Sequence, residues 1–427
     1  MPPKNRATKE TDKPQHQMID STQSLNEDFQ PTTQDELQRF LRSNYEEFKH
    51  TLTPVGGRTE LQLGFRTQTQ KNILLSELDR VVDFPARDMT VTVESGVKID
   101  MLSSLLQQEG LQLPIDVAQS HRATVGGIVA TNTFGSHRFG YGSLRDYVIG
   151  ITAIDGMGRM FHSGGRVVKN VAGYDLCKLM TGSQGTLGVI TQITFKLRPI
   201  PESRGVLWLA CGDHRQVDAL LQCIAGLEID PISIDVLNST AARQIVVESR
   251  LDVAAESPIV VLGVEGSEKS VTHQMTFFRE KLGSYCSSVN ELRDDISIAS
   301  LYKSLIEYRY HSDEPLTIRI AIPPSSLLAA SILLEELRVG FQCYAGCGVS
   351  FAHSSDRIAS AAEARDLVGK IENFCRENSG SLSILQCESD WRPELINSAR
   401  RNDRSSWNRK IKHTFDPANL LNPGFFE

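Results

Sequence analysis

Three clusters of glycine, separated by strand-like segments, constrain this chain more than any other feature of its sequence. They are residues 54–59 (Pro-Val-Gly-Gly-Arg-Thr), 123–127 (Ala-Thr-Val-Gly-Gly) with later glycines at 135, 140 and 142, and 182–188 (Gly-Ser-Gln-Gly-Thr-Leu-Gly). Glycine adopts positive φ and lets a ligand approach the backbone, and successive free N–H groups form anion-binding concavities. None of the clusters contains Asp or Glu, whose charge would repel a diphosphate. We therefore expect a diphosphate-type ligand; the alternative is a set of tight structural turns.

The common nucleotide and nucleophile motifs are absent. No GxGxxG pattern is present, which disfavours a Rossmann site, and no GxxxxGK followed by Ser or Thr, which disfavours a P-loop. Thr181 stands where a nucleophile elbow would need its first glycine, so Ser183 is a poor candidate nucleophile. The glycine clusters therefore indicate a binding site of another kind.

The composition limits the number of domains, the binding partners and the cellular compartment that we expect for this chain. The 427 residues are 40% hydrophobic, enough for two or three domains with real cores. A net charge of −7 argues against nucleic acid, and no run of Lys and Arg indicates an anionic membrane surface. The eight cysteines form no CxxC pair, and Cys343 and Cys347 lack the second half of a zinc or iron–sulfur site. We expect scattered reduced thiols and no metal centre.

The first 30 residues are polar, with few large apolar side chains, and predict a disordered tail. They include no apolar core of a secretory signal, and no later run reaches transmembrane length. We expect a cytoplasmic protein without membrane insertion; attachment to the inner membrane through a partner stays open.

A first domain is predicted over residues 31–201. Thr33 and Glu36 make a capping box for a helix over residues 33–48, and a second helix over 99–109 ends at Gly110. The strand-like segments are residues 73–75, 81–84, 90–93, 147–154, 158–162 and 189–197. Pro199 and Pro201 then mark a domain boundary.

The second domain, residues 202–400, alternates strands and helices in a way that predicts an α+β domain of ferredoxin-like plan. Its predicted strands are residues 206–210, 232–237, 259–265, 316–322, 342–351 and 383–386. Its predicted helices are residues 216–225, 269–282, 325–338 and 360–378. A doubling of one βαβ unit is the only internal repeat that the pattern indicates.

The glycine clusters resemble a known family. Residues 54–59, 123–132 and 182–191 resemble the FAD-binding domain of the vanillyl-alcohol oxidase/PCMH superfamily, and residues 413–424 resemble the chain end of its FAD-linked oxidase branch. The resemblance implies a PCMH-type domain of two α+β subdomains before the second domain. It also implies that residues 401–427 return to the FAD domain.

Two further segments narrow the resemblance. Residues 142–150 and 165–180 are similar to the FAD-binding (GlcE-type) subunits of bacterial glycolate oxidase. This similarity implies two partners, a catalytic flavoprotein subunit and an iron–sulfur subunit.

The superfamily resemblance also assigns cofactor contacts by position. In the first loop these are Pro54, Val55, Gly56, Gly57, Arg58 and Thr59, and in the second Thr124, Gly126 and Gly127; near the flavin ring they are Asn132, Gly135, Tyr141 and Gly142, and at the adenosine half Gly182, Gly185, Gly188, Val189 and Ile190. Covalent members carry a histidine beside the first Gly-Gly. Arg58 stands there in this chain, so the resemblance implies non-covalent FAD.

Catalytic residues are harder to assign. Stand-alone 2-hydroxy-acid dehydrogenases of the superfamily carry a His-x-His-type metal site in the second domain, and this chain has no such motif. We assign no catalytic base. The other candidates are His121 as a residue facing the flavin, Arg145 and Lys169 as cations beside it, and Arg309, Arg319 and Arg357 as a clamp for a substrate carboxylate.

Three functions therefore remain open at this stage. The first is an FAD-binding subunit of a glycolate oxidase-type complex. The second is a self-sufficient FAD-dependent 2-hydroxy-acid dehydrogenase, and the third is a non-catalytic scaffold subunit. The intact glycine clusters disfavour the third.

Overall fold

The structure is a computed structural model that describes residues 28–60, 69–165, 175–228, 231–310, 315–354, 358–399 and 406–424. Lys169 and Arg357, two of the predicted cations, lie outside these ranges, as do residues 1–27. Residues 28–30, predicted as part of the tail, belong to the described fold, because Phe29 bridges to Ile73 and stacks on Phe40 with ring centroids 3.9 Å apart.

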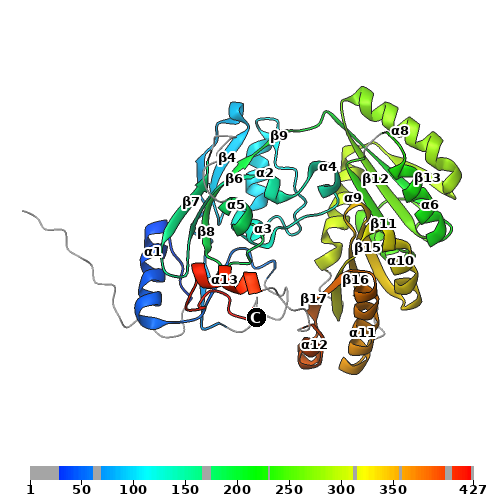
Figure 1. Ribbon diagram of the computed structural model, residues 1–427. Helices are drawn as coiled ribbons and strands as arrows, with labels where there is room; N and C mark the ends of the chain where they lie inside the picture. Colours follow the sequence, from blue (N-terminus) through cyan, green and yellow to red (C-terminus); the bar gives the residue numbers. More distant parts are fainter. Residues whose placement is uncertain are drawn as a thin grey trace, which may run out of the picture.

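The first domain, on the left of Figure 1, starts with a small α+β unit. Helix α1 (Gln34–Ser43) packs Leu37 and Leu41 inward and continues into a π-helical turn, residues 44–48. Its predicted N-cap is present, since Thr33 accepts a hydrogen bond from the Glu36 N–H at 3.2 Å. The reciprocal half of the predicted capping box is displaced by one residue, because Glu36 Oε2 accepts from the Thr32 N–H at 2.9 Å. Strands β1 (Leu52–Val55) and β2 (Lys71–Leu74) pair in parallel beside it.

A five-stranded sheet forms the larger unit of this domain, in the order β3-β4-β8-β6-β7. The strands are β3 (Val81–Asp83), β4 (Thr90–Glu94), β6 (Val148–Ile154), β7 (Met160–Gly164) and β8 (Val189–Lys196). The helices are α2 (Ile99–Gln107), α3 (Val125–Thr131), α4 (Arg138–Tyr141) and α5 (Leu176–Met180). Short strands β5 (Leu111–Gln112) and β9 (Arg198–Pro199) pair with each other.

The second domain is one eight-stranded antiparallel sheet, ordered β13-β10-β12-β11-β15-β16-β14-β17. Its strands are β10 (Ser203–Ala210), β11 (Ser233–Leu237), β12 (Ile259–Gly266), β13 (Ser288–Leu292), β14 (Leu316–Ala321), β15 (Val339–Tyr344), β16 (Val349–Ser354) and β17 (Ser381–Cys387). The second half has the ferredoxin-like βαββαβ order. The first half has the same strand arrangement with an additional helix, α7 (Ser239–Ser249), between β11 and β12, and the halves join where β11 pairs with β15. The predicted doubling is therefore present.

One strand prediction in this domain is wrong. Residues 342–351 are not a single strand, because Gly348, at φ +65°, closes a tight turn between β15 and β16. The two strands then pair as a hairpin, and the Gly348 N–H donates to the Tyr344 carbonyl at 3.0 Å.

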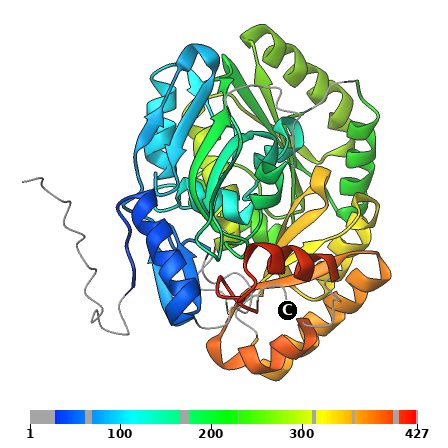
Figure 2. The same ribbon diagram turned by 60° about the vertical axis from the view of Figure 1, so that its left-hand side comes forward.

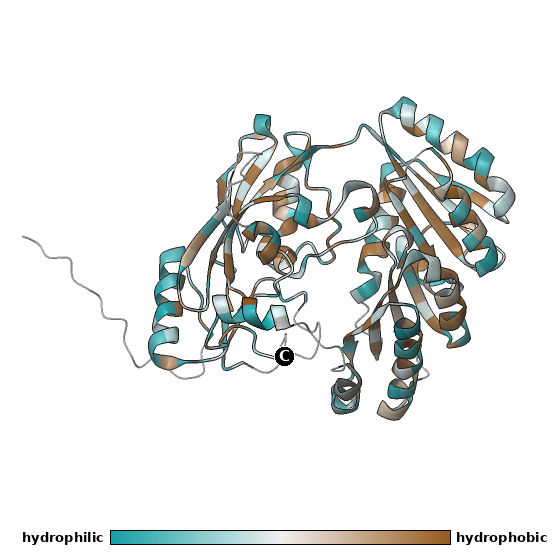
Figure 3. Ribbon diagram, in the orientation of Figure 1, coloured by the Kyte–Doolittle hydropathy of each residue, from teal (hydrophilic) through white to brown (hydrophobic). Residues whose placement is uncertain are grey.

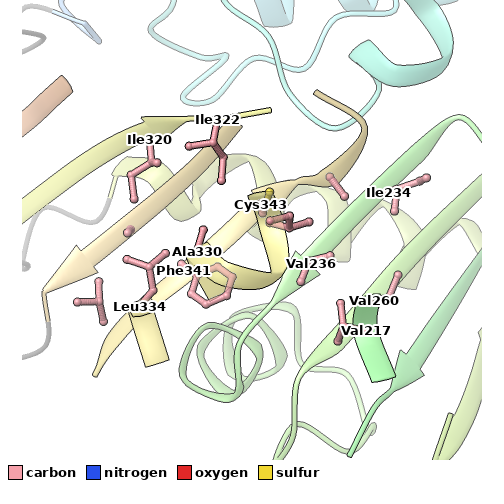
Figure 4. Packing of buried hydrophobic residues seen from close by; sticks show 14 of the residues in the cluster. Val217, Ile234, Val236, Val260, Ile320, Ile322, Ala330, Leu334, Phe341 and Cys343 are labelled. Carbon is pink, nitrogen blue, oxygen red and sulfur yellow. The ribbon is translucent and has the colours of Figure 1, made fainter. Parts of the chain in front are cut away.

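Helices cover the two faces of this sheet differently. Helices α6 (His214–Ala225), α8 (Glu268–Leu282), α10 (Leu327–Glu336), α11 (Ala361–Glu377) and α12 (Arg392–Ala399) lie on one face. The core between them, seen around Phe341 and Cys343 in Figure 4, is apolar throughout. Helices α7 (Ser239–Ser249) and α9 (Asp295–Glu307), which the sequence analysis did not predict, cover only the first half of the other face.

Hydropathy follows this layering. In Figure 3 the strands are mostly brown and the outer sides of the helices mostly teal. Within the ranges that the structure describes, no helix combines the length and the apolar composition needed to cross a membrane.

The chain end lies against the first domain. Helix α13 (Ser406–Phe415), red in Figures 1 and 2, is followed by a segment that pairs with β1. Lys412 holds this segment: its buried Nζ donates to Asp416 Oδ2 at 2.5 Å, to the Leu421 carbonyl at 2.7 Å and to the Thr186 carbonyl at 2.8 Å. Asn422 Nδ2 donates to the Gln184 carbonyl at 2.7 Å, so the chain end supports the third glycine loop.

Removing the Lys412 charge should release this segment. We expect Lys412→Met to lower the free energy of unfolding by about 3 kcal/mol, since Asp416 would be left buried without its cation. Limited proteolysis should then cut near residues 406–424. The control is Lys370→Met, which removes an exposed i,i+4 ion pair on α11 and should change stability by less than about 0.5 kcal/mol. Equal effects of the two substitutions would contradict the anchoring role.

Candidate functional site

The three glycine clusters meet at one cavity of the first domain. Its walls come from the loop after β1, from α3 and from the loop before β8. The predicted residues on these walls are Pro54, Val55, Gly56, Gly57, Arg58, Thr59, Gly126, Gly127, Gly185, Gly188 and Ile190. Segments distant in sequence thus form a single site.

The first glycine pair docks its loop against the start of α3. A Cβ at Gly56 would lie 2.1 Å from Thr124 Oγ1. A Cβ at Gly57 would lie 1.8 Å from the Arg122 carbonyl oxygen. Thr124 caps α3 by accepting a hydrogen bond from the Gly127 N–H at 3.3 Å. These glycines are therefore required by the packing of protein on protein, a reason that the sequence analysis did not give.

The third loop owes its shape to positive φ angles. Gly182, Gln184 and Gly185 have φ of +86°, +56° and +67°. The N–H groups of Gly182 and Gln184 donate to the carbonyls of Val129 and Ala130 at 2.9 and 2.8 Å. The loop is thereby fixed across the end of α3.

Several polar atoms on or next to the lining residues are buried without a hydrogen-bond partner in the described part of the chain. They are Gln184 Oε1 on the wall itself, Ser183 Oγ on the preceding residue, which is not on the wall, and Asn132 Oδ1 at the end of α3. Buried polar groups are normally hydrogen-bonded, so unpaired ones beside a cavity indicate a polar ligand. Acceptors of this kind suit the hydroxyl and N–H groups of a dinucleotide, and the acid-free glycine loops suit its diphosphate.

A second cavity, of about 330 Å³, adjoins the first and lies between the domains. The two cavities share Arg58, Thr59, Glu60, Thr131 and Gln184. The second domain contributes Arg309, Tyr310, Arg319, Phe351, Leu385 and Gln386 to the opposite wall. A ligand that fills the first cavity can therefore reach the second domain.

The alternation of β14 turns Arg319 towards this cavity. Its neighbours Ile318 and Ile320 point into the core on the helical face of the sheet. Arg319 pairs across strands with Phe351, and its Cζ lies 5.5 Å from the Phe134 ring centroid. The half of the sheet that α7 and α9 leave uncovered thus supplies the wall.

Arg309, in the second domain, is held by groups of the first domain. Its Nη2 lies 3.6 Å from Glu60 Oε1, and its Nη1 donates to the Phe134 carbonyl at 3.2 Å. The Tyr310 hydroxyl also donates to Glu60. Burial opposes the charge of Arg309, but Tyr310 and Glu60 outweigh it and raise its pKa.

Arg319 differs from Arg309 in having no carboxylate partner among the described residues. Its Nε is buried without a hydrogen-bond partner among the described residues, and so are Nε and Nη2 of Arg309, whose 3.6 Å contact with Glu60 is an ion pair and not a hydrogen bond. Burial, with repulsion from Arg309 and Arg138, lowers the pKa of Arg319. An anion placed against this guanidinium would relieve both the missing hydrogen bond and the repulsion.

Comparison with known proteins identifies the family. Residues 28–164 match the model of the FAD binding domain. The chain is 30% identical over 420 residues to glycolate oxidase subunit GlcD of Bacillus subtilis (strain 168), covering 92% of this chain and 87% of that one. The chain belongs to the PCMH-type FAD-dependent oxidoreductase family. FAD is therefore the ligand that the glycine loops and the unpaired acceptors accommodate.

Other relatives agree with the family and with the fold. D-2-hydroxyglutarate dehydrogenase of Xanthomonas citri pv. viticola is 26% identical, with 87% of this chain and 83% of that one covered. Glycolate oxidase subunit GlcE of Escherichia coli (strain K12) is 39% identical over 124 residues, which is 29% of this chain and 35% of that one. A structure of alkyldihydroxyacetonephosphate synthase has a TM-score of 0.65 at 17% identity, covering 92% and 75% of the two chains.

Seven of the predicted FAD-contact residues of this flavoprotein do not line the first cavity. Asn132 lines the second cavity, whereas Thr124 supports Gly56 and Gly127 from behind. The remaining five are Gly135, Tyr141, Gly142, Gly182 and Val189, none of which is on the walls. Their contact with FAD stays a prediction.

Three residues that line the second cavity were not predicted from the sequence: Glu60, Phe134 and Tyr310. Only Glu60 had a signal in the sequence that could have indicated it, its position directly after the first glycine motif.

Two further candidates from the sequence lie away from both cavities. Arg145 and His121 are exposed and line neither cavity. In the described part of the chain, no three His, Cys, Asp or Glu side chains form a group that could hold a metal.

A buried polar network joins the two domains of the flavoprotein behind the cavities. His137 Nδ1 bonds to Asp116 Oδ1 at 2.7 Å, and its Nε2 lies 3.9 Å from Glu265. Asp235 Oδ1 accepts from Ser136 Oγ at 2.8 Å and from Gln342 Nε2 at 2.8 Å, while its Oδ2 has no partner among the described residues. The loop that was predicted to contact the flavin therefore docks the domains.

Asp235 makes the stability of this junction depend on pH. Burial raises the pKa of Asp235 to about 7, well above the ordinary range of an aspartic acid, so ionisation of the buried acid costs stability as pH rises from that ordinary range towards 7. We expect Asp235→Asn to raise the free energy of unfolding by about 1–2 kcal/mol near pH 8 and to have no such effect near pH 4. Urea unfolding at both pH values measures it. An equal change at both would contradict the pKa argument.

Proposed function

We propose that this chain is the FAD-binding subunit of a glycolate oxidase-type complex and takes part in flavin-mediated oxidation of a small 2-hydroxy acid. The observation that carries the proposal is Arg319, a buried cation without a carboxylate partner among the described residues, on the wall of the cavity that adjoins the FAD loops. The carboxylate of a 2-hydroxy acid supplies the anion that this position lacks.

The chain's own residues would then bind and orient the substrate. Arg319 holds the carboxylate through its planar guanidinium, while Phe134 and Phe351 limit the access of water to that contact. Burial raises the pKa of Tyr310, so its hydroxyl stays protonated and keeps donating to Glu60. When bound, FAD supplies the two-electron acceptor.

The subunit role is supported by the GlcE and GlcD similarities. Proteins with these two names are glycolate oxidase subunits. A catalytic flavoprotein and an iron–sulfur subunit are the partners we propose. The alternative is a self-sufficient 2-hydroxy-acid dehydrogenase, which is favoured by the long alignment to D-2-hydroxyglutarate dehydrogenase.

The visible spectrum of the purified chain tests the proposal. We expect FAD to co-purify and to be released by acid precipitation, since Arg58 stands where covalent members carry histidine. Glycolate added without oxygen should leave the flavin of the isolated chain oxidised and should bleach it when the partner subunits are present. Bleaching of the isolated chain would favour the self-sufficient enzyme. A chain that cannot be reconstituted with FAD would instead favour the scaffold.

A further inference from the structure

Arg309 and Arg319 both line the second cavity, which lies between the domains, and they differ in whether a carboxylate neutralises their charge. Arg309 has an 8% exposed side chain and pairs with Glu60 at 3.6 Å. Arg319 has no carboxylate partner among the described residues. The other arginines that line this cavity, Arg58 and Arg122, are exposed, so solvent screens their charges. The buried wall thus presents two cations and one carboxylate.

We propose that Glu60 is a specificity-determining residue that restricts this cavity to 2-hydroxy acids with a single carboxylate. The inference rests on the function proposed above and adds the class of substrate. Glycolate and lactate belong to the class that fits, whereas 2-hydroxyglutarate, with a second carboxylate, does not.

The position of Glu60 is determined by contacts across the domain boundary. It follows the glycine pair in the first loop, and the Tyr310 hydroxyl and Arg309 Nη2 of the second domain both approach its Oε1. The carboxylate is largely buried, with a side chain 15% exposed. A group fixed in this way is not free to turn into solvent when a ligand enters.

Charge then decides which acids fit. One substrate carboxylate can pair with Arg319 and leaves the Glu60–Arg309 pair intact. A second carboxylate would have to compete with Glu60 for Arg309, and it would be repelled by Glu60 at close range with little solvent to screen it. Both guanidinium groups lie at Phe134, since Arg309 Nη1 donates to its carbonyl at 3.2 Å and Arg319 Cζ lies 5.5 Å from its ring centroid, so one diacid can meet both.

The experiment compares the binding of two acids to the FAD-loaded full chain. Dissociation constants for glycolate and D-2-hydroxyglutarate are measured by perturbation of the flavin spectrum and by calorimetry, so the readout does not need turnover. We expect the native chain to prefer glycolate. In Glu60→Gln, Arg309 loses its ionic partner, and the preference should shift towards 2-hydroxyglutarate by about tenfold or more, the size of one charge-assisted hydrogen bond.

A second variant separates charge from structural damage. In the double variant Glu60→Gln/Arg309→Gln the extra cation is gone, so the preference for glycolate should return. Glu307→Gln makes the same chemical change at a carboxylate that accepts a hydrogen bond from the Gln119 N–H at 2.7 Å, and it should leave the ratio unchanged. Thermal unfolding of each variant checks folding.

The outcomes distinguish the two proposals. A shift in Glu60→Gln that the double variant reverses supports the inference. Binding of glycolate with an unchanged ratio in Glu60→Gln overturns the inference and leaves the proposed function standing. If neither acid binds the native FAD-loaded chain, both proposals fail. If Glu60→Gln is unstable, the folded double variant and Arg309→Gln still give a decisive pair, because loss of Arg309 alone should weaken the diacid more than glycolate.

Discussion

Gly57→Ala is expected to abolish stable FAD binding. The added Cβ would lie 1.8 Å from the Arg122 carbonyl oxygen, a backbone atom that cannot rotate away. The first loop must therefore shift from the start of α3, and the wall that it shares with Gly126 and Gly127 is lost. We expect the dissociation constant for FAD to rise by at least about a hundredfold and the free energy of unfolding to fall by about 3 kcal/mol. Flavin fluorescence titration and urea unfolding measure the two effects.

The matched control is Gly369→Ala. Gly369 lies within α11, and a Cβ there would meet no atom within 4 Å. Alanine favours a helix interior, so this substitution should stabilise the protein by about 0.5–1 kcal/mol and leave FAD binding unchanged. If Gly57→Ala retained native affinity for FAD, the docking of the first loop on α3 would not be what forms the site.

Arg319→Gln is expected to weaken the binding of every 2-hydroxy acid while FAD stays bound. The glutamine keeps some hydrogen bonding but removes the cation that has no carboxylate partner in the described part of the chain. Removing one partner of a buried charged contact usually costs several kcal/mol, so we expect affinity for glycolate to fall by about a hundredfold. Arg319→Lys should be intermediate, since lysine keeps the charge without the planar fork. Calorimetry on the FAD-loaded chain gives both values.

Arg243→Gln is the control for this series. Arg243 lies on α7 and pairs with the exposed Glu256 at 3.5 Å, away from both cavities. Its loss should change glycolate affinity by less than about twofold. Native affinity in Arg319→Gln would remove the observation that carries the proposed function.

Much of the fold could be predicted from the sequence because it depends on local pattern. The alternation in Val206–Ala210 sends Leu207 and Leu209 to one core and Trp208 to the other. Helix α7 could not be predicted in this way. Its sequence is only weakly amphipathic, and it is helical because Ala241, Ala242 and Ile245 cover a sheet face that is assembled from distant strands.

The candidate site, too, could be predicted from the sequence only where it depends on local motifs. The three glycine clusters and their resemblance to a family were enough to predict an FAD site, because each cluster is a short, contiguous motif that can be recognised in the sequence. By contrast, the charge of the cavity depends on Glu60 and Tyr310, which are 250 residues apart and meet across the domain boundary.

The residues predicted a diphosphate-type ligand, the two-domain α+β plan and the candidates Arg309 and Arg319, and the resemblance to a family identified the ligand as FAD. Only the tertiary structure decided that Arg309 is neutralised by Glu60 while Arg319 is left without a carboxylate among the described residues. Local periodicity determines to which side of a strand a residue points. Which charged group that residue contacts depends on how the sheets of the two domains pack together. Such long-range packing produces no periodic pattern in the sequence.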